Sequence, residues 1–292
     1  MKSSVLLENK KNTKNTNRAK PFLKWAGGKG QLLRQYESFF PSKFNNYLEP
    51  FVGGGAVFFH FYNTGRLKGN KRIILIDDNK ELMNCYSVIK EDVEKLISIL
   101  DCSKYVNKND VYYVIRKEEP QDRLERAART IYLNKTCFNG LYRVNSEGKF
   151  NVPFGKYKNP LICDSGNLRA VSLALRNVEI SPGDFEMCLK LAKKGDFIYF
   201  DPPYQPLSKT SNFTSYTKDS FSKEDQHRLC EVFKKLDKRE CKIMLSNSYT
   251  PFILNLYDNV GIIKEVFAKR AISCKASGRG AIKEAVILNY KV

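Results

Sequence analysis

The chain has 292 residues, 42% of them hydrophobic, which is enough to bury the core of one large domain with or without an insertion. Lys and Arg outnumber Asp and Glu by 50 to 31, and the resulting formal net charge of +19 favours a polyanionic partner such as nucleic acid over a merely solvated basic surface. No apolar run approaches the roughly 20 residues that span a bilayer, and there are only 2 histidines beside 8 scattered cysteines, so neither a membrane protein nor a zinc or other metal site is expected.

The first part of the chain predicts a basic arm followed by a βαβ unit. Residues 1–20 are rich in Lys and Asn without an apolar signal segment, which predicts a disordered arm on a cytoplasmic protein. Residues 22–29 (FLKWAGGK) lead into a short helix. A strand over 47–52 ends at the glycines 53–55, a helix follows, and residues 72–76 form a second buried strand.

A long helical segment comes next. Apolar residues recur at helical spacing over 81–134, and then the periodicity stops. Residues 134–160 form a loop of Asn, Gly, Lys, Arg and aromatic side chains, which contains the run TCFNGLYRVNSEGKFNVPFGKYKNP. A loop of this length is typical of a functional segment rather than of a plain connection. We therefore expect an α/β sheet interrupted by an inserted, mainly helical segment over 82–165.

The alternation of strands and helices resumes after the insertion. An amphipathic helix is predicted over residues 223–236. The predicted strands cover residues 178–180, 197–200, 241–245 and the two arms of a terminal hairpin, 260–267 and 284–290.

The strand over 197–200 ends abruptly at Asp201-Pro202-Pro203-Tyr204. Neither proline can donate to a strand ladder, so the chain leaves the sheet in a stiff turn. The turn holds Asp201 and Tyr204 at the carboxyl edge of the strand, where ligands bind in open α/β sheets. We predict that these four residues are catalytic and act on a planar base flipped out of nucleic acid; a rigid surface turn is the alternative.

The glycines after the first strand indicate a cofactor site. They lie where the backbone must turn tightly, but the segment has neither the G-K-S/T ending of a phosphate loop nor the G-x-G-x-x-G of a dinucleotide fingerprint. Asp77 ends the next strand, where a carboxylate can accept hydrogen bonds from a ribose diol. A nucleoside-bearing cofactor without a bound pyrophosphate fits this pattern best, and a structural turn is the alternative.

The motifs FLKWAGGK, EPFVGGG, IDDN, DPPY and LSNS, in this order, resemble the adenine-specific DNA methyltransferases of the Dam type. The order, with the recognition region between the cofactor motif and DPPY, is similar to that of the α group of amino-methyltransferases. The resemblance covers the chain from about Phe22 to Tyr290. It implies a Rossmann-like S-adenosylmethionine-dependent catalytic domain over 21–81 and 166–292, and a target-recognition domain with a hairpin loop over 82–165.

The resemblance implies S-adenosylmethionine as the cofactor. It assigns the methionine portion to Lys29, the ribose to Asp77 and the adenine to Asp184 with its neighbour Phe185. The implied cofactor-binding residues are Trp25, Ala26, Gly27, Gly28, Lys29, Glu49, Pro50, Phe51, Gly53, Gly54, Gly55, Asp77, Asn79, Asp184, Phe185 and Asp201.

The resemblance also gives the reaction. An exocyclic amine is a poor nucleophile until a carboxylate accepts one of its N–H bonds, here Asp201, and the carbonyl of Pro202 or Pro203 accepts the other. Tyr204 stacks on the base, and the methyl group transfers directly in line without a covalent enzyme intermediate.

In this family, Asp at the first position of the motif favours adenine, whereas Ser suggests cytosine N4 and Asn suggests protein glutamine or some RNA bases. Methylation of cytosine C5 is disfavoured because the chain has no Pro-Cys dipeptide.

The loop over 134–160 resembles the segment that reads GATC in Dam-type enzymes. By that resemblance Arg143 reads a guanine, Leu141 touches a thymine methyl group, and Phe138 with Asn139 supports base flipping. The implied DNA-binding residues are Lys24, Phe138, Asn139, Gly140, Leu141, Arg143, Asn151, Pro153, Lys156 and Lys158, together with Arg270, Lys275 and Arg279 as backbone contacts. The alternatives are a folded aromatic loop without base contacts and, for the last three residues, a charged hairpin.

We therefore expect a site-specific methyltransferase that modifies adenine N6 in double-stranded DNA, at GATC. The alternatives are an N4-cytosine or RNA methyltransferase and a DNA-binding protein that has lost catalysis. We expect a monomeric, cytoplasmic and nucleoid-associated enzyme, encoded by a bacterium or a phage, with no membrane partner. A cognate restriction endonuclease would be its genetic partner in a restriction–modification pair.

Overall fold

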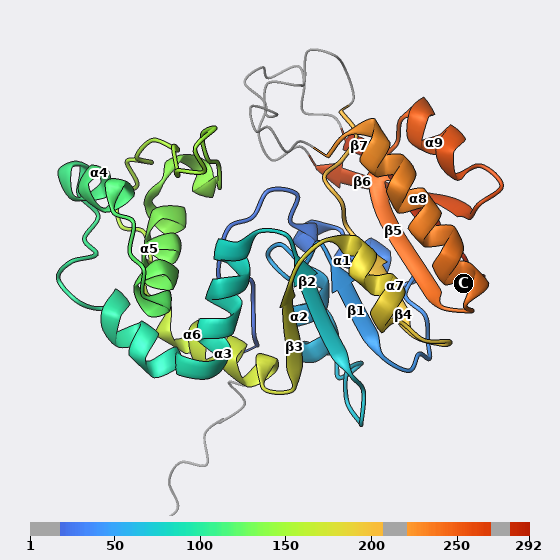
Figure 1. Ribbon diagram of the computed structural model, residues 1–292, viewed down its shortest axis with the longest axis horizontal. Coiled ribbons are helices and arrows are strands. Elements are labelled where there is room, and N and C mark those ends of the chain that lie inside the picture. The colour runs from blue at the N-terminus through green and yellow to red at the C-terminus, as the bar shows by residue number, and fades with distance from the viewer. Residues whose placement is uncertain (1–17, 207–220, 270–280) are drawn as a thin grey trace, which may run out of the picture.

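The computed structural model describes residues 18–206, 221–269 and 281–292, and a seven-stranded sheet lies at its centre (Figure 1). The strands stand in the order β3-β2-β1-β4-β5-β7-β6. Strands β1 to β5 run parallel, and β7 lies antiparallel between β5 and β6. Their bounds are β1 Tyr47–Pro50, β2 Ile73–Asp77, β3 Val178–Pro182, β4 Phe197–Phe200, β5 Lys242–Ser248, β6 Ile262–Lys269 and β7 Ala281–Leu288. The predicted α/β sheet and its terminal hairpin are confirmed.

The helices cover both faces of this sheet. They are η1 Lys29–Gln31, α1 Leu33–Tyr36, α2 Ala56–Asn63, α3 Lys80–Leu100, α4 Asn109–Lys117, α5 Arg123–Thr136, η2 Phe138–Gly140, α6 Ser165–Leu175, η3 Phe185–Met187, α7 Cys188–Leu191, α8 Lys223–Lys238 and α9 Pro251–Tyr257. In the part of the chain that the structure describes, no helix combines the length and the apolar character that crossing a membrane requires.

Strand β4 shows how the sequence separates the two layers of the core. Phe197 and Tyr199 join the hydrophobic cluster that contains α2, α3, α5 and α6, whereas Ile198 and Phe200 join the cluster that contains α8 and α9. Successive side chains of a strand point to opposite faces, so a continuous apolar run supplies both layers. All of β4 is buried, and its carboxyl end is therefore a fixed platform for the turn that follows.

Strands β1 and β4 lie side by side at the centre of the sheet, and the strand order reverses between them. From β1 the chain moves outward through β2 to β3, and it then returns to β4 and moves outward on the other side. This reversal is the topological switch point at which open α/β sheets bind ligands. The glycines after β1 and the turn after β4 both lie at this point.

The predicted helical segment is confirmed as α3, α4 and α5, which lie at one end of the sheet (Figure 1). Helix α3 packs against β2 and β3 and also against α5 and α6. Buried side chains of α4 and α5, such as Tyr112 and Ile131, belong to the same cluster as Phe58 of α2. The inserted helices thus share one continuous core with the sheet. The loop after α5 contains two isolated bridges, Cys137↔Phe154 and Val144↔Phe150.

The structure departs from the predicted elements in a few places. Strand β5 runs on to Ser248 because residues 246–248 pair with β7. Helices α6 and α9 were not predicted, although Asp164 and Thr250 cap their first turns with side-chain hydrogen bonds. At the end of the predicted arm, Ala19 is buried and Lys20 exchanges backbone hydrogen bonds with the Asn167 side chain, so this end belongs to the folded chain.

Candidate active site and nucleic-acid interface

Asp201 follows β4 directly, and two hydrogen-bonding groups hold its carboxylate. The Lys29 Nζ lies 2.7 Å from Asp201 Oδ1, and the Ser246 hydroxyl donates to the same oxygen at 2.9 Å. Among the described residues, both contacts end on Oδ1. Oδ2 is therefore the oxygen available to accept a hydrogen bond from a substrate.

The Lys29–Asp201 pair lies in a poorly solvated place. The Lys29 side chain is 5% exposed and that of Asp201 is 18% exposed. Burial raises the pKa of Asp201 above its ordinary value, whereas the Lys29 ammonium and the Ser246 hydroxyl lower it. Lys29 also donates to the Gly27 carbonyl at 2.6 Å. The ammonium thus stabilises the carboxylate that the proposed chemistry needs.

Tyr204 is held at both ends of its side chain. The Lys29 ammonium lies 4.6 Å from the centre of the Tyr204 ring, which is a cation–π distance. The Tyr204 hydroxyl donates to Glu284 Oε2 of β7 at 2.7 Å. The aromatic ring therefore has a defined orientation beside Asp201.

The two proline carbonyls of the turn are not equivalent. Gln226 of α8 donates from Nε2 to the Pro203 carbonyl at 3.1 Å. Asn247 of β5 donates to Gln226 Oε1 at 3.0 Å and accepts from the Gln205 amide at 3.2 Å. Gln226 and Asn247 are fully buried, so they fix the path of the turn from behind.

Glu49 of β1 is a second buried carboxyl near Asp201. It is 2% exposed, and burial raises its pKa to about 8; the Tyr47 hydroxyl at 2.7 Å and the Phe58 amide oppose this rise, and the charge on Asp201 adds to it. Burial therefore favours the neutral form of Glu49 near neutral pH, and a neutral Glu49 avoids a second buried charge near Asp201.

Glu49 makes the stability of the fold depend on pH. The pKa of Glu49 in the folded chain, about 8, exceeds its ordinary value of 4.5. The protonated Glu49 side chain therefore contributes to the free energy of unfolding fully below about pH 4.5, and this contribution is lost as the pH rises to about 8. In Glu49→Gln, the free energy of unfolding should fall less between about pH 5 and about pH 8 than in the wild type. Urea unfolding across this range measures the slope. The exposed Glu119→Gln is the control, and equal slopes in wild type and Glu49→Gln would contradict the prediction.

The glycine turn after β1 is built around Asp77 and Trp25. Gly53 has φ 48°, and a Cβ placed there would lie 2.7 Å from Cδ1 of Trp25, so only glycine lets the indole pack on this turn. Asp77 accepts from the Gly53 amide at 2.9 Å and from the Asn79 amide at 3.0 Å. Burial raises the pKa of Asp77 to about 6, and these two amide hydrogen bonds lower it. Backbone and carboxylate thus present a polar cradle at the sheet edge.

Aromatic side chains lie beside this cradle. Phe51, which has φ 62°, stacks on Phe185 with ring centres 5.3 Å apart, and Phe221 packs edge-on against Phe51. Asp184 caps the turn at Glu186 and forms an ion pair with Arg228 at 3.1 Å. Flat apolar rings next to carboxylates suit a nucleoside, whose base is planar and whose sugar offers hydroxyl donors.

The remaining predicted cofactor residues lie around the same edge. The Gly28 amide donates to the Trp25 carbonyl at 3.2 Å, which places Ala26 and Gly27 in one tight turn. Pro50 is the last residue of β1, and Gly54 lies against Trp25 and Leu23. Within the described ranges, no group of three or more His, Cys, Asp or Glu side chains is placed to hold a metal ion.

The predicted recognition residues come together around Lys24. Asn134 of α5 accepts from the Lys24 amide and donates to the carbonyls of Lys24 and Gly140. Gly140 has φ 63°, and a Cβ there would lie 2.5 Å from Lys24 Cδ. The Lys24 ammonium lies 4.8 Å from the centre of the Tyr157 ring. The loop and the segment before Trp25 therefore form one surface.

On this surface two apolar side chains are exposed, Phe138 at 50% and Leu141 at 37%. Arg143 donates from Nε to the Asn151 side chain at 2.7 Å and from Nη2 to its carbonyl at 3.3 Å. The Phe138 amide donates to the Pro153 carbonyl at 2.8 Å. A guanidinium can donate to the acceptors of guanine, and an apolar side chain can contact the methyl group of thymine.

The other predicted DNA contacts are more scattered. Asn139 and Lys156 adopt positive φ angles of 56° and 54°, and Lys158 is exposed in the same loop. Arg270, Lys275 and Arg279 lie outside the described residues.

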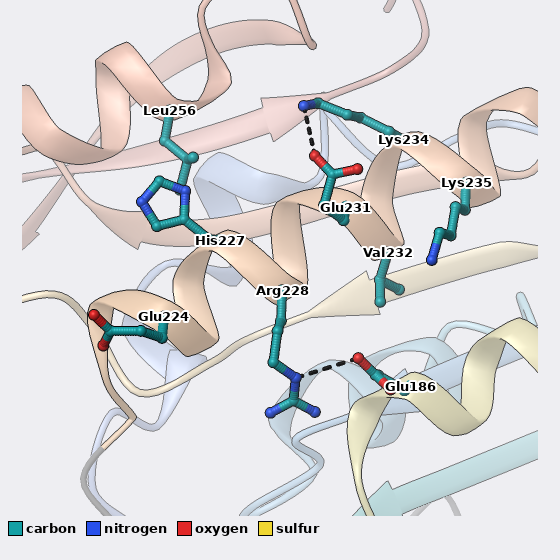
Figure 2. A pocket seen from close by; sticks show the side chains of 9 residues that line it. All are labelled: Glu186, Glu224, His227, Arg228, Glu231, Val232, Lys234, Lys235 and Leu256. Carbon is teal, nitrogen blue, oxygen red and sulfur yellow. Dashed lines mark hydrogen bonds and ion pairs between the residues drawn. The ribbon is translucent and has the colours of Figure 1, made fainter.

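A hollow of about 480 Å³ lies on the outer side of α8, and none of its lining residues belongs to the turn after β4 (Figure 2). Most of its lining comes from α8, where Glu231 forms an ion pair with Lys234. Arg228 points from α8 to Glu186 at one edge of the hollow. The turn Asp201-Pro202-Pro203-Tyr204 lies elsewhere, at the carboxyl end of β4.

The site also contains several residues that were not predicted from the sequence. Ser246, Gln226 and Glu284 contact the turn after β4 from β5, α8 and β7. Tyr142 stacks on Trp25 with ring centres 5.3 Å apart and so joins the recognition loop to the cofactor edge. Ser246 lies in the motif LSNS, which could have indicated its role, whereas Glu284 lies in none of the motifs.

The chain is similar to known proteins over most of its length. The family model for D12 class N6 adenine-specific DNA methyltransferases matches residues 25–272. The type II methyltransferase M.MjaIII of Methanocaldococcus jannaschii is 47% identical over 290 residues, covering 93% of this chain and 99% of that protein. M1.LlaDCHI of Lactococcus lactis subsp. cremoris is 44% identical over 285 residues, covering 95% and 98%. The DNA adenine methylase of Haemophilus influenzae is 36% identical over 278 residues, covering 92% and 93%.

These matches extend over nearly the whole folded chain and confirm the resemblance noted in the sequence. DNA methyltransferases of this family use S-adenosylmethionine as the methyl donor, which confirms the predicted cofactor. The chain belongs to the D12 class of N6 adenine-specific DNA methyltransferases.

Proposed function

We propose that this adenine methyltransferase acts at GATC in double-stranded DNA, and that it flips the target adenine into the turn after β4. The observation that carries the proposal is the Asp201 carboxylate, fixed through Oδ1 by Lys29 and Ser246. A base inside a duplex cannot reach a carboxylate at a sheet edge, so the target nucleotide must leave the stack.

At the turn, the residues would act on the exocyclic amine in defined ways. Asp201 Oδ2 accepts one N–H of the amine and raises the electron density on its nitrogen. The second N–H goes to the Pro202 carbonyl, because Gln226 already donates to the carbonyl of Pro203. Tyr204 stacks on the base. These contacts hold the nitrogen for direct in-line attack, without a covalent enzyme intermediate.

The residues around the glycine turn fit S-adenosylmethionine. When bound, it supplies a methyl group activated by the sulfonium. We assign the ribose to Asp77 and the adenine to the Phe51–Phe185 pair with Asp184, which lie together at the switch point of the sheet. Lys29 would then serve both Asp201 and the methionine portion.

We assign target recognition to residues 82–165, with Arg143 as the reader of a guanine. Asn151 orients the guanidinium, which suits bidentate bonding to guanine O6 and N7. Phe138 and Leu141 are the exposed apolar groups beside it, suited to a wedge and to a thymine methyl contact. Lys24 reaches the same surface. Two relatives are named type II methyltransferases, which supports a restriction–modification role beside a cognate endonuclease.

Methylation of matched duplexes tests the proposed function. One duplex carries GATC, and others carry a single changed base pair or a cytosine in place of the target adenine. Transfer of labelled methyl groups only to the GATC duplex, at adenine N6, is the expected result. Equal transfer to all adenine-containing duplexes would remove the GATC assignment. A sedimentation measurement with and without DNA tests the expected monomer.

Changing Arg143 to Ala should relax specificity at one guanine position. The loss in discrimination there should be about 1–3 kcal/mol, because one bidentate contact disappears while the catalytic turn stays intact. Competition between GATC and duplexes substituted at each position measures the effect. The exposed Arg176→Ala on the far end of α6 is the matched control, and unchanged preference in Arg143→Ala would remove Arg143 as the reader.

A further inference from the structure

We propose that Glu284 of β7 is a positioning residue for the reaction: it orients the Tyr204 ring against the flipped base through its hydrogen bond to the Tyr204 hydroxyl. The inference rests on the proposed stacking role of Tyr204. It assigns a function to a strand that none of the catalytic motifs includes.

The backbone of Glu284 is fixed on both sides. It pairs with Ser248 of β5 and with Val266 of β6, so the carboxyl group starts from a rigid position between two strands. Its neighbour Lys283 points to the other face, where it forms an ion pair with Glu265 at 3.0 Å. Strand periodicity therefore directs Glu284 toward the catalytic turn.

Tyr204, in contrast, stands on a turn outside the sheet. The ring contacts the Lys29 ammonium at 4.6 Å, but a cation over a ring does not stop the ring from turning about its own axis. The hydrogen bond to Glu284, at 2.7 Å, adds the second fixed point. Two such points define both the place and the tilt of the surface on which a base stacks.

Burial and neighbouring charges act in opposite directions on the carboxyl group of Glu284. Burial and the Asp201 carboxylate raise the pKa of Glu284, whereas the Tyr204 hydroxyl and the Lys29 ammonium lower it. The Lys29 ammonium thus favours the ionised form of both Asp201 and Glu284. The net effect of these groups is to raise the pKa of Glu284, while the Tyr204 hydroxyl, which donates at 2.7 Å, favours the ionised carboxylate.

A double-mutant cycle on Glu284 and Tyr204 tests the inference. Glu284→Ala and Tyr204→Phe each remove the hydrogen bond but keep an aromatic ring at 204. Each should lower the single-turnover methylation rate about ten- to hundredfold, the range for a hydrogen bond to a charged group. The double variant should be no slower than either single variant, because both remove the same contact. Glu284→Gln should recover part of the rate lost in Glu284→Ala, since the amide oxygen still accepts the bond but carries no charge.

Two further readouts separate positioning from a general structural role. The fluorescence of 2-aminopurine at the target position should rise less in Glu284→Ala than in the wild type, while S-adenosylmethionine affinity and the thermal unfolding midpoint stay unchanged. Glu265→Ala, on the same hairpin, is the matched control and should behave as wild type in every assay. Losses that multiply in the double variant would overturn the inference, as would a wild-type rate in Glu284→Ala. If wild-type enzyme itself gave no fluorescence rise and no transfer to GATC, the proposed function would fail instead.

Discussion

Changing Asp201 to Asn should reduce the single-turnover rate of adenine methylation on the order of 10²–10³-fold, the loss seen when one preorganised electrostatic contact is removed. The amide keeps the shape of the side chain but loses the negative charge that strengthens the hydrogen bond from the amine and raises the electron density on its nitrogen. Asn is preferred to Ala here, because Ala would leave the buried Lys29 ammonium without its partner at 2.7 Å. An uncompensated buried charge costs roughly 3–5 kcal/mol of stability.

The measurement is labelled methyl transfer to a GATC duplex at saturating enzyme. S-adenosylmethionine binding, followed by calorimetry, should remain within a few-fold of the wild-type affinity. The exposed Asp258→Asn beside α9 controls for the loss of one carboxylate elsewhere. Wild-type turnover in Asp201→Asn would overturn the role assigned to the carboxylate, whereas lost cofactor binding would shift that role to the cofactor site.

The sheet could be predicted because the sequence patterns that indicate its strands and turns each lie within a short segment. The apolar run 197–200 followed by two prolines predicts both the strand and its abrupt end. The glycines after β1 predict a tight turn, and the structure places Gly53 at φ 48° there. In a parallel sheet, such turns must meet at one edge. Sequence position and topology together therefore bring Asp77 and Asp201 to one place.

The partners that tune the site were not predictable in the same way. Glu284 is 80 positions from Tyr204, and it reaches the turn only because β7 inserts between β5 and β6. That arrangement depends on long-range pairing, which no local pattern encodes. Likewise, the sequence around Gln226 indicates only a polar position of an amphipathic helix. The hydrogen bond from its side-chain amide to the Pro203 carbonyl is visible only in the structure. The missed cap at Thr250-Pro251 is different, because there the local signal was present.

Lys29 is the residue whose removal should change the pH dependence of the reaction most. In the proposed mechanism the active form of Asp201 is the carboxylate, so activity should fall as the pH drops through the Asp201 pKa. The Lys29 ammonium lowers that pKa against the effect of burial. Lys29→Met removes the ammonium, so the pKa of Asp201 rises and the acid limb of the rate profile moves to higher pH.

At neutral pH the Lys29→Met enzyme should therefore be slower by about tenfold or more, and part of the rate should return as the pH is raised. Lys29→Arg keeps a cation beside Asp201 and should keep the acid limb near its wild-type position, even if its larger head lowers the maximal rate. Lys234→Met, on the solvent side of α8, removes one positive charge far from the turn and serves as the control. Single-turnover rates across pH measure all four proteins. An acid limb that does not move in Lys29→Met would show that the 2.7 Å contact does not set the protonation of Asp201, and the charge that prepares the amine would have to come from elsewhere in the site.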